Sequence, residues 1–332
     1  MRAAGASGLG LAALSASTFG TSGSFATALM GSGWTPGAAV TVRVAAAALM
    51  LTVPALLQLR GRWGLLRRSL PAVIAYGLVA IAGCQLFFFN AVEHLSVSVA
   101  LLLEYSGTML VVLWLWLRHS QRPRRLTVLG GLIAIAGLVL VLDLTGNQRA
   151  DLVGVLWGAT AAAGLAVYFV LSARIDDLLP PIVMAWAGMV VGGIALGVFG
   201  LTGLIGFGAS TSDVDFAGHR TSWLVPVVGL SLVAAVIAYT AGIGAARRLG
   251  AKVASFVGLT EVLFAALWAW LLIGQRPTLL QGIGGLVVLA GIALVRADEP
   301  AIEMELTGTE PTGTEPTGTE PTGSQLPVAT AP

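Results

Sequence analysis

Apolar residues fill this chain in long runs that short polar breaks separate, and the runs last about 20 residues. A helix needs roughly 20 residues to cross about 30 Å of hydrocarbon, so these runs predict membrane-spanning helices and not the helices of a soluble core. The predicted spans are Leu9–Met30, Gly37–Leu57, Leu70–Ala91, Val97–Leu117, Leu126–Leu142, Leu152–Leu171, Ile182–Leu204, Trp223–Gly244, Val253–Ile273 and Leu279–Val295. The pattern predicts an all-α membrane protein of ten transmembrane helices.

The chain also repeats itself at an offset of 154 residues without a gap. The matches include Val99-Ala100 with Val253-Ala254, Trp114 and Trp116 with Trp268 and Trp270, Gln121-Arg122-Pro123 with Gln275-Arg276-Pro277, Gly130-Gly131 with Gly284-Gly285, and Ala136-Gly137 with Ala290-Gly291. Each half has an odd number of spans, so the second half enters the membrane the opposite way up. We therefore expect two inverted five-helix repeats, residues 1–142 and 152–296, an architecture that places binding sites between the halves near the midplane.

Residues 297–332 differ in composition from the rest of the chain. Asp298-Glu299-Pro300 is followed by three copies of Thr-Gly-Thr-Glu-Pro from Thr307 onward, and this segment has almost nothing to bury. It is predicted to be a disordered cytoplasmic tail.

The distribution of Lys and Arg among the predicted loops gives an orientation. With the N-terminus inside, fourteen of the 18 basic residues lie in cytoplasmic loops or ends, three lie outside and Arg43 lies within a span. Cytoplasmic loops carry the excess of Lys and Arg, so both termini are predicted to lie in the cytoplasm.

Composition excludes several classes of function. The chain is 56% hydrophobic and only 10% charged, and its arginines form no dense basic face, so no nucleic-acid partner is expected. Cys84 is the only cysteine, and His94, His119 and His219 lack ligand spacing, so no metal site or other cofactor is predicted. The sequence contains no nucleophile elbow, phosphate loop or HExxH motif that would indicate an enzyme.

Three features of the sequence resemble those of a known family. They are Arg43 in the second span, the junction from Asn90 to Ser96 before the fourth span, and the Gln-Arg-Pro turns that precede Gly-Gly helices. In their order they are similar to the drug/metabolite transporter superfamily, in particular its EamA-like branch of ten-helix exporters. The resemblance implies a multi-pass protein of the cytoplasmic (inner) membrane of a bacterium that exports small metabolites.

Ionisable groups inside spans are costly and tend to mark transport pathways, and the chain has three, namely Arg43, Glu104 and Glu261. Arg43 and Glu104 lie at similar depth, roughly 9–11 Å into their spans, and could form an ion pair. Glu261 corresponds to Gly107 in the first half, one helical turn from Glu104. We expect both carboxylates to face a common cavity, where one of them exchanges a proton as substrate leaves. The alternative is a structural clamp of Arg43 with Glu104, beside a Glu261 that only accepts hydrogen bonds.

Further polar side chains are candidates for the cavity wall. Ser15, Thr18 and Ser22 form a stripe on the first span that either lines the cavity or bonds back to its own helix. Tyr105, Tyr239 and Asn90 are candidate substrate contacts, whereas the tryptophans near span ends favour interfacial anchoring. Gly-x-x-x-Gly patterns such as Gly154 to Gly158 favour helix packing and leave a homodimer open.

The sequence thus favours a secondary-active transporter that exports small metabolites, with proton antiport as the hypothesis for its coupling. The resemblance to the EamA-like branch implies amino acids or related polar compounds as the substrate class. Import or exchange of another metabolite, such as a nucleoside or sugar, is the alternative. A membrane-embedded sensor or enzyme is the more distant one. The expected partners are the lipid bilayer, a small-molecule substrate and protons.

Overall fold

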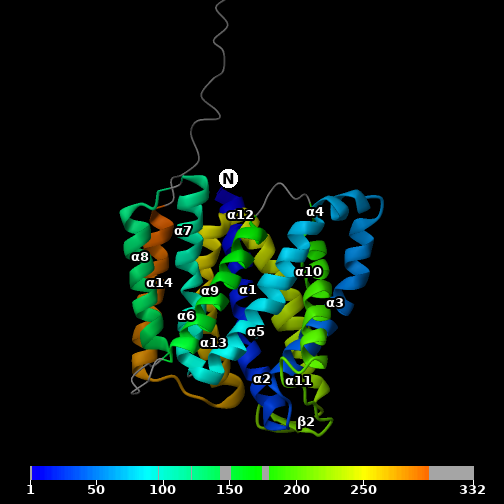
Figure 1. Ribbon diagram of the computed structural model, residues 1–332. Helices are drawn as coiled ribbons and strands as arrows, with labels where there is room; N and C mark the ends of the chain where they lie inside the picture. Colours follow the sequence, from blue (N-terminus) through cyan, green and yellow to red (C-terminus); the bar gives the residue numbers. More distant parts are fainter. Residues whose placement is uncertain (1, 96, 121, 143–150, 174–178, 299–332) are drawn as a thin grey trace, which may run out of the picture. The chain divides into compact units, whose positions relative to one another are not determined.

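The computed structural model describes residues 2–95, 97–120, 122–142, 151–173 and 179–298, and the predicted tail lies outside them apart from Ala297 and Asp298. The described part is almost entirely helical (Figure 1). Its helices are α1 (Arg2–Gly20), α2 (Ser22–Gly31), α3 (Pro36–Leu59), α4 (Trp63–Ala75), the π-helical η1 (Tyr76–Gly83), α5 (Cys84–His94), α6 (Val97–Tyr105), α7 (Gly107–His119), α8 (Arg125–Val141), α9 (Leu152–Ser172), α10 (Pro181–Leu201), α11 (Leu224–Val228), the π-helical η2 (Gly229–Ile237), α12 (Ala238–Gly258), α13 (Thr260–Ile273) and α14 (Leu279–Ala297).

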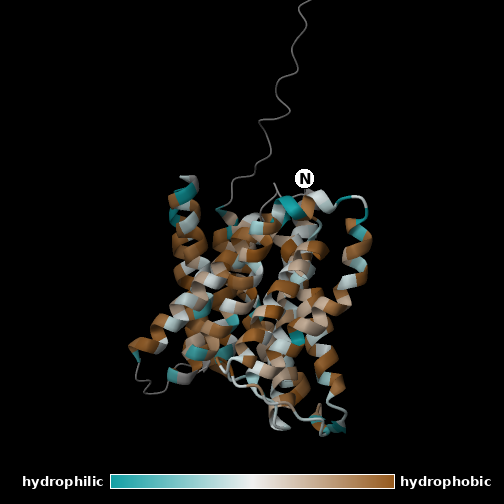
Figure 2. Cartoon of the chain, turned by 45° about the vertical axis from the view of Figure 1, so that its right-hand side comes forward, coloured by the Kyte–Doolittle hydropathy of each residue, from teal (hydrophilic) through white to brown (hydrophobic). Residues whose placement is uncertain are grey.

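Within the described residues, seven helical runs are long and apolar enough to cross a membrane. They are Pro36–Leu59, Trp63–Val92, Val99–Arg118, Leu152–Ser172, Pro181–Leu201, Leu224–Gly258 and Leu279–Ala297, and the shorter apolar helices are Arg125–Val141 and Thr260–Ile273. Figure 2 shows hydrophobic residues along most of the helix lengths, with hydrophilic residues mainly towards the helix ends. The chain is therefore a helical, multi-pass membrane protein, as its apolar runs predict.

Several predicted spans are not continuous α-helices. The first span is broken at Thr21, the fourth at Ser106 and the ninth at Leu259, just before Thr260. At each break a hydroxyl donates to the carbonyl three residues earlier: Thr21 to Thr18 at 2.6 Å, Ser106 to Leu103, and Thr260 to Val257 at 2.7 Å. Such local bonds compete with the helical backbone pattern, which apolar periodicity does not register.

The eighth predicted span does not end at Gly244. The helix continues past Gly244 as far as Gly250, whose φ of 77° is not helical, so α12 consists of two helical segments that meet at this residue. Only glycine adopts this left-handed conformation without strain. Gly250 therefore marks the break between these two segments, and it lies between Gly244, the predicted end of the eighth span, and Val253, the predicted start of the ninth.

The interruptions occur at matching places in the two halves. Shifted by 154 residues, η1 would cover 230–237, which lies within η2, and Ser106 falls on Thr260. π-Helical turns of this kind are rare and are frequently found at functional sites.

Helices α8 and α14 lie side by side at one edge of the described part (Figure 1) and approach through glycines of the internal repeat. A Cβ on Gly130 would lie 2.7 Å from the carbonyl oxygen of Gly291, and one on Gly137 would lie 2.8 Å from that of Gly284. Since the earlier glycine of α8 faces the later one of α14, the two helices run antiparallel. Any larger side chain at these positions would force the two backbones apart.

The all-α prediction missed a β-hairpin between α10 and α11. Its strands, β1 (Val214–Phe216) and β2 (His219–Thr221), pair antiparallel through a turn in which Ala217 and Gly218 both have positive φ. This is the backbone pattern of a two-residue hairpin turn that matches strand twist. The hairpin packs on α2 through Phe216, which stacks on Phe25 at 5.2 Å between ring centroids.

Asp298 belongs to the folded part, although the sequence boundary assigns it to the tail. It follows the last residue of α14 and is only 5% exposed. One of its carboxylate oxygens accepts hydrogen bonds from the backbone N–H of Thr127 at 3.0 Å and from the Thr127 hydroxyl at 2.5 Å. Asp298 therefore caps the N-terminus of α8 from another helix, where a negative charge is stabilising.

Candidate functional site

A cavity of about 220 Å³ lies among helices of both halves of the chain. The first half contributes residues of α1, α2, α3, η1, α5 and α6 to its wall, and the second half contributes residues of α9, α12 and α13. All three ionisable residues that the sequence places inside spans, Arg43, Glu104 and Glu261, line it. The fold thus brings together three groups that are as far as 218 positions apart in the chain.

Arg43 extends from α3 and is 8% exposed. Its Nη2 donates to the carbonyl oxygen of Ala234 at 2.8 Å, and its guanidinium carbon lies 5.8 Å from the centroid of the Phe19 ring. Ala234 belongs to η2, where the π-helical turn shifts the backbone bonding away from the usual α pattern. Arg43 therefore links the two halves of the chain through a backbone carbonyl and an aromatic ring.

The expected ion pair between Arg43 and Glu104 does not form, because within the described residues neither side chain is an ion-pair partner. Glu104 instead accepts a hydrogen bond from the Cys84 thiol, with 3.2 Å between Sγ and Oε1. Depth in the membrane places two groups at one level, but it does not decide which way each side chain turns.

Glu104 on α6 and Glu261 on α13 enter the cavity from the helices next to the two corresponding breaks. The two carboxyl groups are near enough for their charges to interact, and Tyr105 is the side chain beside Glu261 that can donate to it. Two acidic groups from different halves thus line one cavity of about 220 Å³.

The other candidate residues divide into two groups. Tyr105, Tyr239, Ser15 and Ser22 line the cavity, and the Ser15 hydroxyl also donates to the Ala238 carbonyl at 2.8 Å.

Thr18 and Asn90 are not part of the cavity wall. Thr18 donates back to the carbonyl of Leu14 at 2.7 Å, and Asn90 donates back to that of Leu86 at 2.7 Å. Both side chains bond to the preceding turn of their own helix. For Thr18, this is the alternative to lining the cavity that the sequence left open for the stripe on the first span.

Sequence reasoning missed an aromatic group behind the charged residues. The Tyr239 ring lies 4.8 Å from Phe19 and 5.7 Å from Tyr168, both edge-on, and Tyr168 lies 5.8 Å from Tyr76. These rings come from α1, α12, α9 and η1, so no local pattern connects them. Cys84 and its neighbour Gln85 also line the cavity, and no sequence pattern singles them out.

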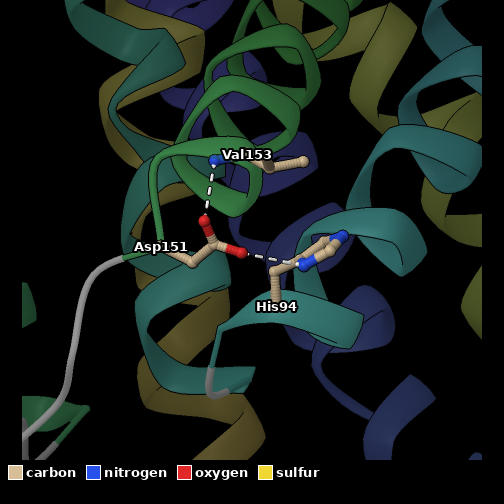
Figure 3. Close-up of polar contacts among 3 residues, drawn as sticks. All are labelled: His94, Asp151 and Val153. Carbon is tan, nitrogen blue, oxygen red and sulfur yellow. Dashed lines mark hydrogen bonds and ion pairs between the residues drawn. The ribbon is translucent and has the colours of Figure 1, made fainter.

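His94, one of the three histidines without ligand spacing, forms an ion pair at the end of α5 (Figure 3). His94 Nδ1 lies 2.9 Å from a carboxylate oxygen of Asp151, whose other oxygen accepts from the backbone N–H of Val153 at 3.1 Å. Asp151 is the N-cap of α9, so this pair fastens the end of α5 to the start of α9. His94 has a structural partner here and is not aimed at the cavity.

The tryptophans near span ends also fall into two kinds. Trp114, Trp116 and Trp270 are about 45% exposed, as expected of side chains that anchor a helix at a membrane interface. Trp268 instead donates from Nε1 to the carbonyl of Ser17 at 3.0 Å and ties α13 to α1. Trp268 therefore differs from the other three tryptophans, because it packs inside the fold.

Comparisons with known proteins agree with the sequence resemblance. The family model described as EamA-like transporter family matches residues 6–143 and again residues 152–297. The chain is 26% identical over 238 residues to the uncharacterized inner membrane transporter YicL of Salmonella typhimurium, covering 70% of this chain and 75% of that protein. It is 25% identical over 229 residues to the uncharacterized transporter YdfC of Bacillus subtilis, covering 68% and 71%. A solved crystal structure with 17% sequence identity has the same fold, with a TM-score of 0.70 over 89% of this chain and 99% of that one.

Proposed function

We propose that this chain, which belongs to the EamA-like transporter family, is a secondary-active exporter that moves amino acids or related polar compounds in exchange for protons. The observation that carries this proposal is the cavity between the two halves, with a partly buried carboxyl group from each half and Arg43 in its wall. Membrane transport itself follows from the family and from the names of the relatives. Direction, cargo and coupling are the proposed part.

The proposed architecture is ten spans in two inverted five-helix repeats. It is supported by contacts that recur after a shift of 154 residues. A Cβ on Gly131 would meet the side chain of Met109, and one on Gly285 would meet Leu263, which is the counterpart of Met109. The antiparallel approach of α8 and α14 has the same local two-fold relation. Equivalent contacts made by equivalent residues are what two inverted copies of one unit would produce.

The proposed orientation places both termini in the cytoplasm of a bacterium. The supporting observation is the excess of Lys and Arg in the loops that would then be cytoplasmic. The name of the relative YicL supports an inner-membrane location.

The proposed coupling uses the two carboxyl groups as exchangeable proton sites. Two ionised carboxylates that share one buried space repel each other, so proton uptake by one of them relieves that repulsion. A substrate that binds to the same groups competes with the proton, and one leaves as the other enters. Arg43 would hold the opposite wall in place through Ala234.

Flux measurements in proteoliposomes with an imposed pH gradient test this proposal. Glu104→Gln and Glu261→Gln are each expected to abolish gradient-driven flux, because an amide keeps the side-chain shape but cannot exchange a proton. Asp215→Asn, the same change at an exposed position of the hairpin, is the matched control and should leave flux unchanged. Gradient-driven flux that persists in both glutamine variants would rule out proton coupling through this pair.

A further inference from the structure

The two carboxyl groups in the cavity receive few hydrogen bonds from the protein. Among the described residues, the Cys84 thiol donates to Glu104, and Tyr105 is the neighbour that can donate to Glu261. An ionised carboxylate can accept about four hydrogen bonds, and a thiol is a weak donor. A ligand with N–H groups would supply what these two acidic groups lack.

Two of the three serine hydroxyl groups in the cavity wall do not fill this need, and the third, that of Ser22, comes from α2. Ser15 donates to the carbonyl of Ala238 at 2.8 Å, and Ser255 donates to that of Lys252 at 2.8 Å. Both are therefore already bonded to the backbone.

The one basic side chain in the wall is poorly placed to receive an anion. Arg43 uses Nη2 for the carbonyl of Ala234, its Nε is buried without a hydrogen-bond partner, and Phe19 lies against the guanidinium. Two-pronged recognition of a carboxylate needs two neighbouring N–H donors that point at the ligand. With two acidic groups and one basic group, the wall favours a positively charged ligand.

Aromatic rings complete the wall beside the acidic groups. Phe19, Phe88, Tyr168 and Tyr239 line the same cavity. Ring faces attract cations and also offer apolar surface to the body of a ligand. A cavity of about 220 Å³ is smaller than the pockets of about 300–1,000 Å³ that hold drug-sized ligands, so the ligand must be compact.

We propose that the cavity binds a small organic cation with N–H donors, namely a primary or secondary ammonium on a compact, preferably aromatic, body. The ammonium lies between Glu104 and Glu261 and donates to both, and the body packs on the rings. The inference rests on the proposed function, because it names the substrate class of the same cavity. Among amino acids and related polar compounds, it selects amines over zwitterions and carboxylates.

Calorimetric binding to the purified full chain in lipid nanodiscs, at neutral pH, tests the charge class with four probes that share one body. The probes are 2-phenylethylamine, phenylalanine, 3-phenylpropanoate and trimethyl(2-phenylethyl)ammonium. We expect the primary amine to bind about ten- to a hundredfold more tightly than the carboxylate and the trimethylammonium, which lack N–H donors for the two carboxylates. Tightest binding by phenylalanine or by the carboxylate would overturn the inference. This series needs no variant protein.

Variants then locate the binding site. Glu104→Gln and Glu261→Gln should each weaken amine binding by about tenfold or more, whereas Asp215→Asn should not change it. Amine affinity that is the same in wild type and in both folded glutamine variants would also overturn the inference. Amine binding without gradient-driven flux of any probe would support the ligand class and refute the proposed proton-driven transport. Flux of the carboxylate without amine binding would support transport and overturn the ligand class.

Discussion

The contact between α8 and α14 makes a sharp prediction about a single methyl group. In Gly291→Ala, the new Cβ would lie 2.5 Å from the Gly130 carbonyl oxygen, 2.5 Å from the Ala134 nitrogen and 2.8 Å from the Ala134 Cα. These are backbone atoms, so no rotation of a side chain relieves the overlap, and the two helices must separate. Gly282→Ala in the same helix is the matched control, because a Cβ there meets nothing within 4 Å.

The magnitude follows from two opposing effects. Replacing glycine by alanine at an exposed helical position stabilises by about 0.8–1 kcal/mol, and this gain applies to both variants. Overpacking a close contact costs about 1–3 kcal/mol, and this cost applies only to Gly291→Ala. The two variants should therefore differ by about 1–3 kcal/mol, with Gly282→Ala equal to or above wild type and Gly291→Ala below Gly282→Ala.

Thermal unfolding of the purified variants, followed by tryptophan fluorescence, measures this difference. At about 2–4 °C per kcal/mol for chains of 150–250 residues, we expect Gly291→Ala to unfold roughly 2–12 °C below Gly282→Ala. Equal unfolding temperatures, or a higher one for Gly291→Ala, would refute the close antiparallel approach of α8 and α14. That result would also remove one of the observations that support inverted repeats.

Two further predictions concern side chains that bond across the fold. A chain that ends at Asp298 should be as stable as the full chain. A chain that ends at Ala297 lacks the cap of α8 and should lose about 1–2 kcal/mol of unfolding free energy, which the same thermal assay measures. Equal stability of the two truncated chains would mean that the cap contributes nothing. Cys84→Ala should lower gradient-driven flux several-fold, because Glu104 loses the thiol as its hydrogen-bond donor. Cys84→Ser should keep most of the flux, because a hydroxyl can donate in place of the thiol. Equal flux in the two variants would show that this hydrogen bond does not position the Glu104 carboxylate.

The cavity shows how far sequence reasoning reaches for a membrane protein. The family was predictable, and the match of the EamA-like model to both halves confirms the resemblance. The shared location of Arg43, Glu104 and Glu261 was predictable as well, because charge inside an apolar run leaves few stable locations other than an interior cavity. The hydrogen-bond partners of these residues were not predictable, since Arg43 donates to the backbone carbonyl of Ala234, 191 residues away, and Glu104 accepts from the thiol of Cys84.

The amino-acid sequence alone predicts which segments enter the membrane, because the preference of a side chain for hydrocarbon over water is a local property that accumulates along about 20 residues. It also determined which glycines recur, and these glycines allow α8 and α14 to approach. Which hydroxyls line the cavity and which bond to their own helix could not be predicted from the pattern of residues. Ser15 and Thr18, one helical turn apart in α1, illustrate the difference: a carbonyl of α12 accepts from Ser15, whereas carbonyls of α1 itself accept from Thr18. Hydrogen-bond partners depend on which backbone groups neighbouring helices present, and packing of the whole fold sets that.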